Sequence, residues 1–298
     1  MAARLSVCLA LSVLLVGCGS STAPSSRPAA VLRAGFAYDS SAPLGYTDRG
    51  RVNRRTDPVA IHDISFRSDG ERVDGYLLLP PGRARRPAVV FVHGSGGDRR
   101  ELLGKAALLA ARNVVTLTIT EPSTSSPPAP AAGALAILRQ VRDAEIRDVI
   151  AIRRAIDLLQ SLPEVDPRRI GYLGWSAGAK TGTYVAASEP RVKALVLLSA
   201  GAAPLAAFVA AAPPDLRRSV RLTLGSIDPI HYIAAARPES VLLEDGTKDE
   251  VVPHAALLNI VRAAPKRTTV RWYRAPHALD STAYRDAFDW LQRSLRPG

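Results

Sequence analysis

The sequence has 298 residues, of which 47% are hydrophobic and 22% are charged, and its formal net charge is +12. This composition is that of an ordinary globular protein and excludes a fibrous or largely disordered chain, while the length allows one large α/β domain. The arginines are spread through every segment and form no basic stripe interleaved with aromatic residues. We therefore expect no nucleic-acid partner, and at most a weak attraction to an anionic membrane surface.

The first 18 residues indicate export. Arg4 precedes an apolar run over residues 5–16, which is shorter than the roughly 20 residues that a membrane span needs. Residues 1–17 are therefore predicted to be a signal peptide. Residues 15–18, Leu-Val-Gly-Cys, resemble the lipobox of bacterial lipoproteins, which implies lipidation of Cys18 and a chain anchored to the bacterial cell envelope, on its periplasmic or extracellular face. The alternative is an ordinary signal peptide cut nearby, with Cys18 left as a free thiol.

The segment after Cys18 has little regular pattern. Residues 19–30 are rich in Ser, Pro and Ala and are predicted to form a flexible tether. Residues 31–58 contain few large apolar side chains and are expected to be irregular. Because Cys8 is lost with the signal peptide, the mature chain holds no pair of thiols and no disulfide is expected. One folded domain is therefore expected over residues 59–298, preceded by the lipidated cysteine, the tether and the irregular segment over 18–58.

From residue 59 the pattern becomes regular. Residues 59–66 and 72–79 are rich in β-forming side chains and flank the turn signal Asp69-Gly70, so an antiparallel hairpin is predicted. Six continuous apolar runs follow, which is typical of strands buried on both faces in a parallel sheet. These runs are residues 88–92, 114–119, 170–173, 194–198, 241–243 and 269–272.

Helices connect these strands. Five apolar residues between the fourth and fifth strands recur at spacings of three and four, which predicts one face of a helix: Ile146, Val149, Ile152, Ile156 and Leu159. Eight strands with helices on both faces form a mostly parallel, doubly wound α/β sheet. Ligands of such sheets bind beyond the carboxyl ends of the strands, so functional residues are expected just after each strand.

Residues 93–97, His-Gly-Ser-Gly-Gly, directly follow the third strand. Small residues let backbone N–H groups approach a ligand oxygen, and a helix expected to begin within 98–103 adds the positive end of its dipole. We expect the N–H groups of Ser95 and Ala177 to bind the oxyanion of a tetrahedral intermediate, and His93 to brace the loop. A phosphate-binding loop is the alternative, although the lysine of a Walker motif is missing.

Residues 174–178, Gly-Trp-Ser-Ala-Gly, directly follow the fifth strand and precede a stretch without proline that can be helical. In the pattern Gly-x-Ser-x-Gly the turn from strand to helix is so sharp that the serine adopts a strained backbone conformation. Side chains two residues away would collide, which explains the glycines at 174 and 178. Ser176 is the predicted nucleophile.

An acidic loop follows the seventh strand. A carboxylate there can reach under a histidine, fix its tautomer and stabilise the imidazolium that forms during attack. Asp249 is the predicted acid. Asp245 lies close to the strand end and is expected to be a turn residue, and Glu250 is expected to point away; both stay open as alternatives.

His277 directly follows the eighth strand and precedes a final amphipathic helix. A histidine at this place can accept the proton of Ser176 and return it to the leaving group. A surface histidine without a catalytic role is the alternative. His62, His231 and His254 have no comparable position after a strand.

These segments, with the hairpin ahead of them, resemble the α/β-hydrolase superfamily, and within it the dienelactone hydrolase-like and prolyl oligopeptidase-like branches. Three segments carry the resemblance: residues 93–97; residues 166–170, Asp-Pro-Arg-Arg-Ile; and residues 246–253, where Gly, Asp, Val and Pro recur in the family spacing. The order serine, aspartate, histidine is also that of this fold. The resemblance covers roughly residues 59 to 295 and implies the α/β-hydrolase fold.

By this resemblance Ser176 is the nucleophile, Asp249 the acid and His277 the base, with no metal and no cofactor. Dienelactone hydrolases carry a cysteine at the nucleophile position, so their specific reaction is not expected of a serine. The residue before the base is usually glycine but is Pro276 here.

The segment between the sixth and seventh strands, about residues 200–238, is short and rich in Ala and Pro, which predicts a short lid. A small acyl pocket is expected to be lined by Ala202, Leu205, Phe208 and Val209. We expect a carboxylesterase that acts on a small-molecule ester through an acyl-enzyme. The alternatives are a serine peptidase or amidase of the same fold, and a non-catalytic binding lipoprotein of the cell envelope.

Overall fold

The structure is a computed structural model that describes residues 34–127, 133–237 and 239–297. The predicted signal peptide, the predicted lipidation site Cys18 and the predicted tether over 19–30 lie outside these residues. No helix in the described ranges is both long enough and apolar enough to cross a membrane.

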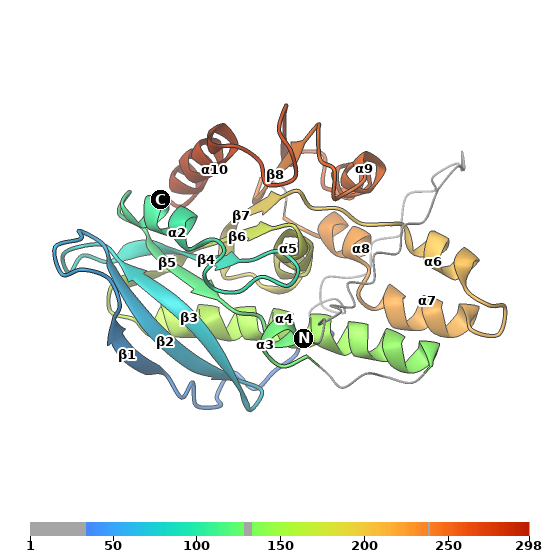
Figure 1. The fold of residues 1–298 in the computed structure, drawn as a ribbon, viewed down its shortest axis with the longest axis horizontal. Coiled ribbons are helices and arrows are strands. Elements are labelled where there is room, and N and C mark those ends of the chain that lie inside the picture. Colours follow the sequence, from blue (N-terminus) through green and yellow to red (C-terminus); the bar gives the residue numbers. More distant parts are fainter. Residues whose placement is uncertain (1–33, 128–132, 238, 298) are drawn as a thin grey trace, which may run out of the picture.

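One sheet of nine strands forms the centre of the molecule, in the spatial order β1-β2-β3-β5-β4-β6-β7-β8-β9 (Figure 1). In this order, β5, β4, β6, β7, β8 and β9 each pair in parallel with the next. At one edge, β1 pairs antiparallel with β2, β2 with β3, and β3 with β5. The strands are β1 (Thr47–Arg51), β2 (Ala60–Ser68), β3 (Glu71–Leu79), β4 (Arg86–Val92), β5 (Val115–Ile119), β6 (Val165–Trp175), β7 (Val192–Leu198), β8 (Val241–Gly246) and β9 (Thr269–Tyr273).

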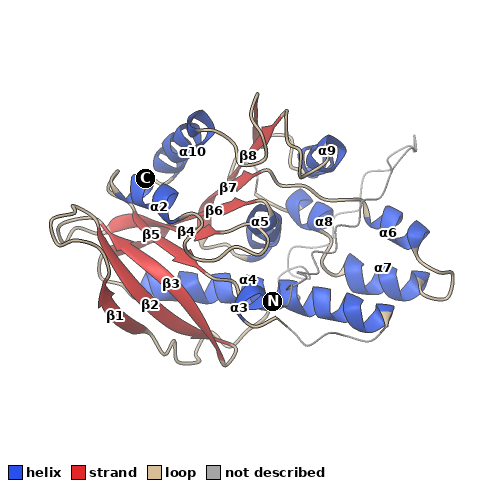
Figure 2. Cartoon of the chain, in the orientation of Figure 1, coloured by secondary structure: helices blue, strands red, loops and turns tan. Residues whose placement is uncertain are grey.

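Helices cover both faces of this sheet (Figure 2). Side chains alternate along a strand, so Val89 and Val90 of β4 belong to two different apolar clusters, one on each face. Helices α2 and α10 pack in the cluster of Val89, and helices α4 and α5 pack in that of Val90. The helices are α2 (Leu103–Ala110), α3 (Pro122–Ser125), α4 (Ala134–Ser161), α5 (Ala177–Ser188), α6 (Leu205–Ala211), α7 (Arg217–Gly225), α8 (Pro229–Ala234), α9 (His254–Ala263) and α10 (Ser281–Ser294).

The predicted hairpin is present as β2 and β3, with Ser68 paired to Glu71. Its two turn residues, Asp69 and Gly70, have φ values of 48° and 77°. A two-residue hairpin turn with positive φ at both positions matches the right-handed twist of the strands, and Asp-Gly is a favoured sequence for it. The local sequence therefore determines the register of this pair.

Strand β1 corrects the sequence analysis, which expected eight strands and irregular structure over residues 31–58. Its residues are mostly exposed and show no apolar alternation. The strand forms because Thr47 and Asp48 pair antiparallel with Ser65 and Ile64 of β2. An edge strand of this kind depends on its neighbour and not on its own side chains, so periodicity does not reveal it.

Residues 34–46 have almost no regular structure, but they pack against the domain. Phe36 is 1% exposed and lies between Tyr184 of α5 and Tyr232 of α8, with ring centroids 5.6 Å and 5.3 Å away. Burial of one phenylalanine contributes on the order of 2 kcal/mol. This part of the chain therefore belongs to the folded domain.

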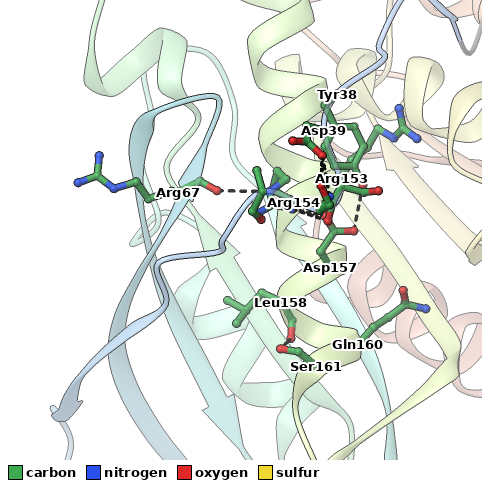
Figure 3. A network of polar contacts seen from close by, with 12 residues as sticks. Tyr38, Asp39, Arg67, Arg153, Arg154, Asp157, Leu158, Gln160 and Ser161 are labelled. Carbon is green, nitrogen blue, oxygen red and sulfur yellow. Dashed lines mark hydrogen bonds and ion pairs between the residues drawn. The ribbon is translucent and has the colours of Figure 1, made fainter.

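Polar contacts from α4 attach the same segment (Figure 3). Arg154 donates to the carbonyl oxygen of Ala42 at 2.7 Å and to Asp157 at 2.8 Å. The hydroxyl of Tyr38 donates to Asp157 at 2.9 Å, and Arg191 also contacts this carboxylate. The arginine side chains thus satisfy backbone carbonyls of a segment that is not itself a strand or a long helix.

The connection between β7 and β8 carries three short helices, α6, α7 and α8. Tyr184 of α5 donates a hydrogen bond to the carbonyl of Ile227, just before α8, at 2.9 Å. In Figure 1, α6 and α7 extend away from the sheet, with α7 next to α4. The sequence predicted a short segment here, and its small helices agree with that expectation.

Candidate active site

The turn between β6 and α5 places Ser176 in a strained conformation, with φ 56° and ψ −114°. A Cβ atom added at Gly174 would lie 2.4 Å from the carbonyl oxygen of Gly178, and one at Gly178 would lie 2.4 Å from that of Val92. Real Cβ atoms do not approach so closely, so both glycines are sterically required, as the motif predicts. Because the turn is so tight, it presents the hydroxyl of Ser176 at the carboxyl edge of the sheet.

Three side chains that the sequence singled out meet at this edge. The Oγ of Ser176 lies 2.8 Å from the Nε2 of His277. The Nδ1 of the same imidazole lies 2.7 Å from the Oδ2 of Asp249. The side chains of His277 and Asp249 are 8% and 2% exposed, so water does not compete for their contact. A hydroxyl, an imidazole and a carboxylate are thus connected in one line of hydrogen bonds.

The loop after β8 holds the carboxylate of Asp249 in place. Its Oδ1 accepts the backbone N–H groups of Val251 at 2.9 Å and Val252 at 2.7 Å. Its other oxygen, Oδ2, therefore faces His277. The two backbone donors therefore set the orientation of this carboxylate.

Two rivals for the acid do not lie where the sequence analysis put them. Asp245 is not a turn residue: it is the second-last residue of β8 and is 1% exposed. Burial, together with the nearby charge of Asp249, raises the pKa of Asp245 to about 7. Glu250 does not point away, because its Oε2 accepts the backbone N–H of His277 at 3.3 Å. Of these three acids, only Asp249 bonds to the imidazole.

Two residues that the sequence analysis missed position His277 through its carbonyl oxygen. This oxygen accepts the indole N–H of Trp175 at 3.0 Å and the hydroxyl of Ser199 at 2.9 Å. The ring of Trp175 also packs against the imidazole, with centroids 5.2 Å apart. Ser199 directly follows β7, and this position after a strand was a signal that could have revealed it.

The loop over 93–97 lies directly against the Ser176 turn, because the N–H of Gly178 donates to the carbonyl of His93 at 3.0 Å. Ala177 is the first residue of α5, so its N–H has no acceptor within the helix. Among the described residues, neither this N–H nor that of Ser95 donates a hydrogen bond. Helix α2 begins only at Leu103, after a turn.

A carboxylate that the sequence analysis did not consider supports this loop from α2's side. Oε2 of Glu101 accepts the N–H of Gly94 at 2.8 Å. A Cβ atom at Gly97 would lie 2.3 Å from the same oxygen. The carboxylate therefore occupies the space that the missing side chain leaves, and a side chain at position 97 would displace it from Gly94.

His93 is placed as a brace of the loop, as expected. Its ring is buried; Nδ1 donates to the carbonyl of Gly94 at 2.7 Å, and Nε2 accepts the N–H of Glu121 at 3.2 Å. Burial lowers the pKa of His93, so the ring stays neutral at physiological pH and both nitrogens are engaged. It makes no contact with Ser176 that could serve proton transfer.

Two buried carboxyl groups, those of Glu121 and Asp148, lie near the loop over 93–97, where the backbone of Glu121 bonds to His93. Burial raises the pKa of Glu121 well above its usual range, and the charges of Asp148 and Glu145 raise it further. Burial also raises the pKa of Asp148 to about 6, against the N–H of Ser123, which donates to it at 2.9 Å. The protonated form of the Glu121 carboxyl is therefore favoured by its surroundings.

The expected lining of the acyl pocket lies on and before α6. Ala202 is tied to α9, because its N–H donates to Ala256 at 3.1 Å and its carbonyl accepts from Asn259 at 2.9 Å. Val209 is 8% exposed, whereas Leu205 and Phe208 are half-buried. That these residues bind an acyl group stays a prediction. Over the described residues, no group of three or more His, Cys, Asp or Glu side chains could hold a metal ion.

A family model for the alpha/beta hydrolase family matches residues 89–296. The fold is similar to that of acetyl xylan esterase 1 from Thermoanaerobacterium sp. JW/SL YS485, with a TM-score of 0.73 and 16% identity over 92% of this chain and 96% of that one. It is also similar to an acetyl xylan esterase from Paenibacillus sp. R4, with a TM-score of 0.71 and 17% identity over 90% and 92% of the two chains.

A cold-adapted esterase from an Arctic intertidal metagenomic library gives a TM-score of 0.63 and 20% identity over 84% of this chain and all of the other. Among curated proteins, a polyketide transferase of Stachybotrys chlorohalonatus (strain IBT 40285) is 29% identical over 136 residues, 45% of this chain. The match spans only 42% of that relative's length. The described fold is the α/β-hydrolase fold, and the chain belongs to the alpha/beta hydrolase family.

Proposed function

We propose that this chain is a serine hydrolase that cleaves carboxylic esters through an acyl-enzyme, with Ser176, His277 and Asp249 as its catalytic triad. One observation carries the proposal: Nε2 of His277 lies 2.8 Å from the hydroxyl of Ser176, while Nδ1 lies 2.7 Å from Asp249. A general base must be within about 2.6–3.2 Å of the proton that it accepts. The esterase folds among the structural neighbours agree with this reaction class.

In the proposed first step, the Oγ of Ser176 forms a bond to the carbonyl carbon of the ester, and its proton passes to Nε2 of His277. The carboxylate of Asp249 stabilises the imidazolium that results. The carbonyl oxygen gains negative charge and accepts hydrogen bonds from the N–H groups of Ser95 and Ala177. Each such donor lowers the barrier by about 3 kcal/mol in typical hydrolases.

In the second step, the bond between the carbonyl carbon and the alcohol oxygen breaks. The imidazolium of His277 gives its proton to the leaving alcohol, and the acyl group stays on Ser176. Water then attacks the acyl-enzyme with His277 again as the base, which releases the carboxylic acid and restores the hydroxyl. No other group has to change its protonation state in this cycle.

A fluorophosphonate probe tests the nucleophile, because it phosphonylates only an activated serine. We expect one probe per chain on the wild type and none on Ser176→Ala, with matching hydrolysis of nitrophenyl acetate. Ser95→Ala is the control, since the proposed role of Ser95 uses its backbone N–H and not its hydroxyl. Folded wild-type protein that takes up no probe and turns over no ester would support a non-catalytic binding protein instead.

A preference for short acyl chains is part of the proposal and rests on the small residues expected around the pocket. Hydrolysis of nitrophenyl esters should fall as the acyl chain lengthens. A steady rise from about two to sixteen acyl carbons would contradict a small pocket. Parallel assays with the matching anilides distinguish an esterase from an amidase or peptidase.

Export and lipid anchoring at Cys18 are a second, independent proposal. The sequence of residues 15–18 supports it. Metabolic labelling with an alkyne-bearing fatty acid should mark the wild type in the membrane fraction, and Cys18→Ser should carry no label. Equal labelling of both chains would rule out this attachment site.

A further inference from the structure

An arginine-lined hollow of about 440 Å³ lies at the opposite end of the sheet from Ser176. It is bounded by the amino ends of β4 and β5, the amino half of β6 and the end of α10. Ser176, Asp249 and His277 lie after the carboxyl ends of the strands, so this arginine hollow is separate from the site of the proposed reaction. Its volume lies within the range of pockets that hold small molecules.

The lining is strongly positive. It contains a single acidic residue, Asp289, against six arginines: Arg85, Arg86, Arg112, Arg169, Arg293 and Arg296. Arg112 pairs with Asp289 at 2.6 Å. Within the described part of the chain, none of the other five arginines lies within ion-pair distance of a carboxylate. The arginine hollow therefore carries several positive charges with no counter-charge from the protein.

Arg86 shows that these charges are built into the fold. It is 5% exposed, although a buried charge is costly unless it is paired. Backbone carbonyls hold its guanidinium, with Ala84 accepting at 2.7 Å and Gly82 at 3.1 Å, and Asn113 accepts from Nε at 2.5 Å. The carbonyl of Pro81 also accepts from this guanidinium, so most of its N–H groups are engaged and its direction is fixed. None of these acceptors carries a negative charge, so a positive charge is held in place beside the hollow.

Arg169 is fixed in a similar way, because its Nε donates to the carbonyl of Leu295 at 2.6 Å. Arg293 and Arg296 are exposed at the end of α10, beside Arg169. Guanidinium groups bind phosphate through two parallel N–H···O bonds, which makes arginine the preferred residue for such anions. Several arginines around one hollow match a ligand with several anionic groups better than a single carboxylate.

We propose that this hollow is a binding site for a small ligand that carries two or more phosphate groups. Arg86 and Arg169 form its fixed wall, and Arg293 and Arg296 close over the ligand from the end of α10. The phosphate groups can belong to a soluble molecule or to a lipid headgroup. The site goes beyond the proposed ester hydrolysis and does not depend on it.

The test measures binding of inorganic tripolyphosphate to the full-length chain by calorimetry. The variant is Arg293→Gln/Arg296→Gln. The matched control is Arg218→Gln/Arg221→Gln. It removes the same charge from two exposed positions of α7 that are three residues apart, as Arg293 and Arg296 are. All four substitutions are at exposed side chains, and thermal unfolding verifies that each variant is folded.

We expect saturable binding near one ligand per chain, weakened at least about tenfold in the α10 variant and less than about twofold in the α7 control. Raising the salt from about 50 to 300 mM should weaken it further, because the contacts are ionic. Absence of saturable binding at low salt would overturn the proposal. So would equal weakening in both variants, because net charge alone would then explain the binding.

Vesicles with cardiolipin, a lipid whose headgroup carries two phosphates, distinguish the two sources of phosphate. Competition of these vesicles with tripolyphosphate, lost in the α10 variant only, would identify a lipid headgroup. Tripolyphosphate binding that these vesicles leave unchanged would identify a soluble ligand. Both results support the site.

Discussion

Replacing Asp249 by asparagine tests the proposed triad most directly, because the structure predicts which way the new amide turns. Oδ1 of Asp249 accepts two backbone N–H groups, at 2.9 Å and 2.7 Å. Asparagine has one acceptor oxygen, which stays with these two donors, so its NH2 group faces Nδ1 of His277. The imidazole then accepts at Nδ1 and carries its proton on Nε2, directed at Ser176.

In that tautomer His277 cannot accept the proton of Ser176, and no charge stabilises the imidazolium. We expect kcat to fall about 10⁴-fold, which corresponds to about 5.5 kcal/mol of the barrier. KM should change little, because Asp249 lies behind the imidazole and is not expected to contact the substrate. Steady-state hydrolysis of nitrophenyl acetate measures both constants, and thermal unfolding checks that the asparagine variant is folded.

Glu250→Gln is the matched control, since it removes a neighbouring negative charge. The amide oxygen of glutamine can still accept the N–H of His277, so kcat should stay within about fivefold of the wild type. The reasoning is refuted if folded Asp249→Asn keeps more than about one tenth of the wild-type kcat. A large loss in Glu250→Gln with little in Asp249→Asn would move the role of the acid to Glu250.

Three further substitutions test the frame around the site. Gly178→Ala would place a Cβ 2.4 Å from a backbone oxygen of Val92, so we expect a loss of about 2–3 kcal/mol in the free energy of unfolding and a marked fall in kcat. Phe36→Ala should cost about 3–5 kcal/mol in urea denaturation, because this ring is 1% exposed. Glu244→Gln concerns pH: burial raises the pKa of Glu244 from 4.5 to about 8, so the folded chain holds a proton that the unfolded chain loses. The wild type should therefore lose stability as pH rises from about 4.5 to 8, by up to about 5 kcal/mol, whereas the glutamine variant should lose less over this range.

Each of these expectations has a clear contrary outcome. An unchanged melting temperature and kcat in Gly178→Ala would mean that the turn has room for a side chain. Phe36→Ala with wild-type stability would show that the segment before β1 contributes nothing to the fold. Parallel pH profiles of unfolding for the wild type and Glu244→Gln would mean that Glu244 ionises normally inside the protein.

The parallel strands and the tight serine turn are visible in the sequence because their causes are local. Strands buried on both faces need continuous apolar residues, and the predicted run at 88–92 lies within β4. The hairpin turn needs positive φ at two neighbouring residues, and Asp69-Gly70 supplies them. Glycines at 174 and 178 are required by contacts within and next to one short motif.

Other features depend on partners far away in the chain. Strand β1 has no apolar pattern and forms only because β2 offers a free edge. Trp175 and Ser199 bond to the carbonyl of His277 from 102 and 78 positions away. The place of Ser199 after a strand marks it as a candidate, but nothing in the sequence shows that both residues meet this carbonyl. The arginine hollow likewise joins side chains from separate strands and the end of α10.

By itself, the sequence determined the fold class, the strained turn at Ser176 and the order of the three candidate triad residues, because apolar periodicity and backbone sterics act over a few residues. Only the tertiary structure decided that Asp249, and not Asp245 or Glu250, bonds to the imidazole. All three acids lie within six positions of one another, and the choice among them depends on how the chain bends after β8 and which backbone N–H groups then hold each carboxylate.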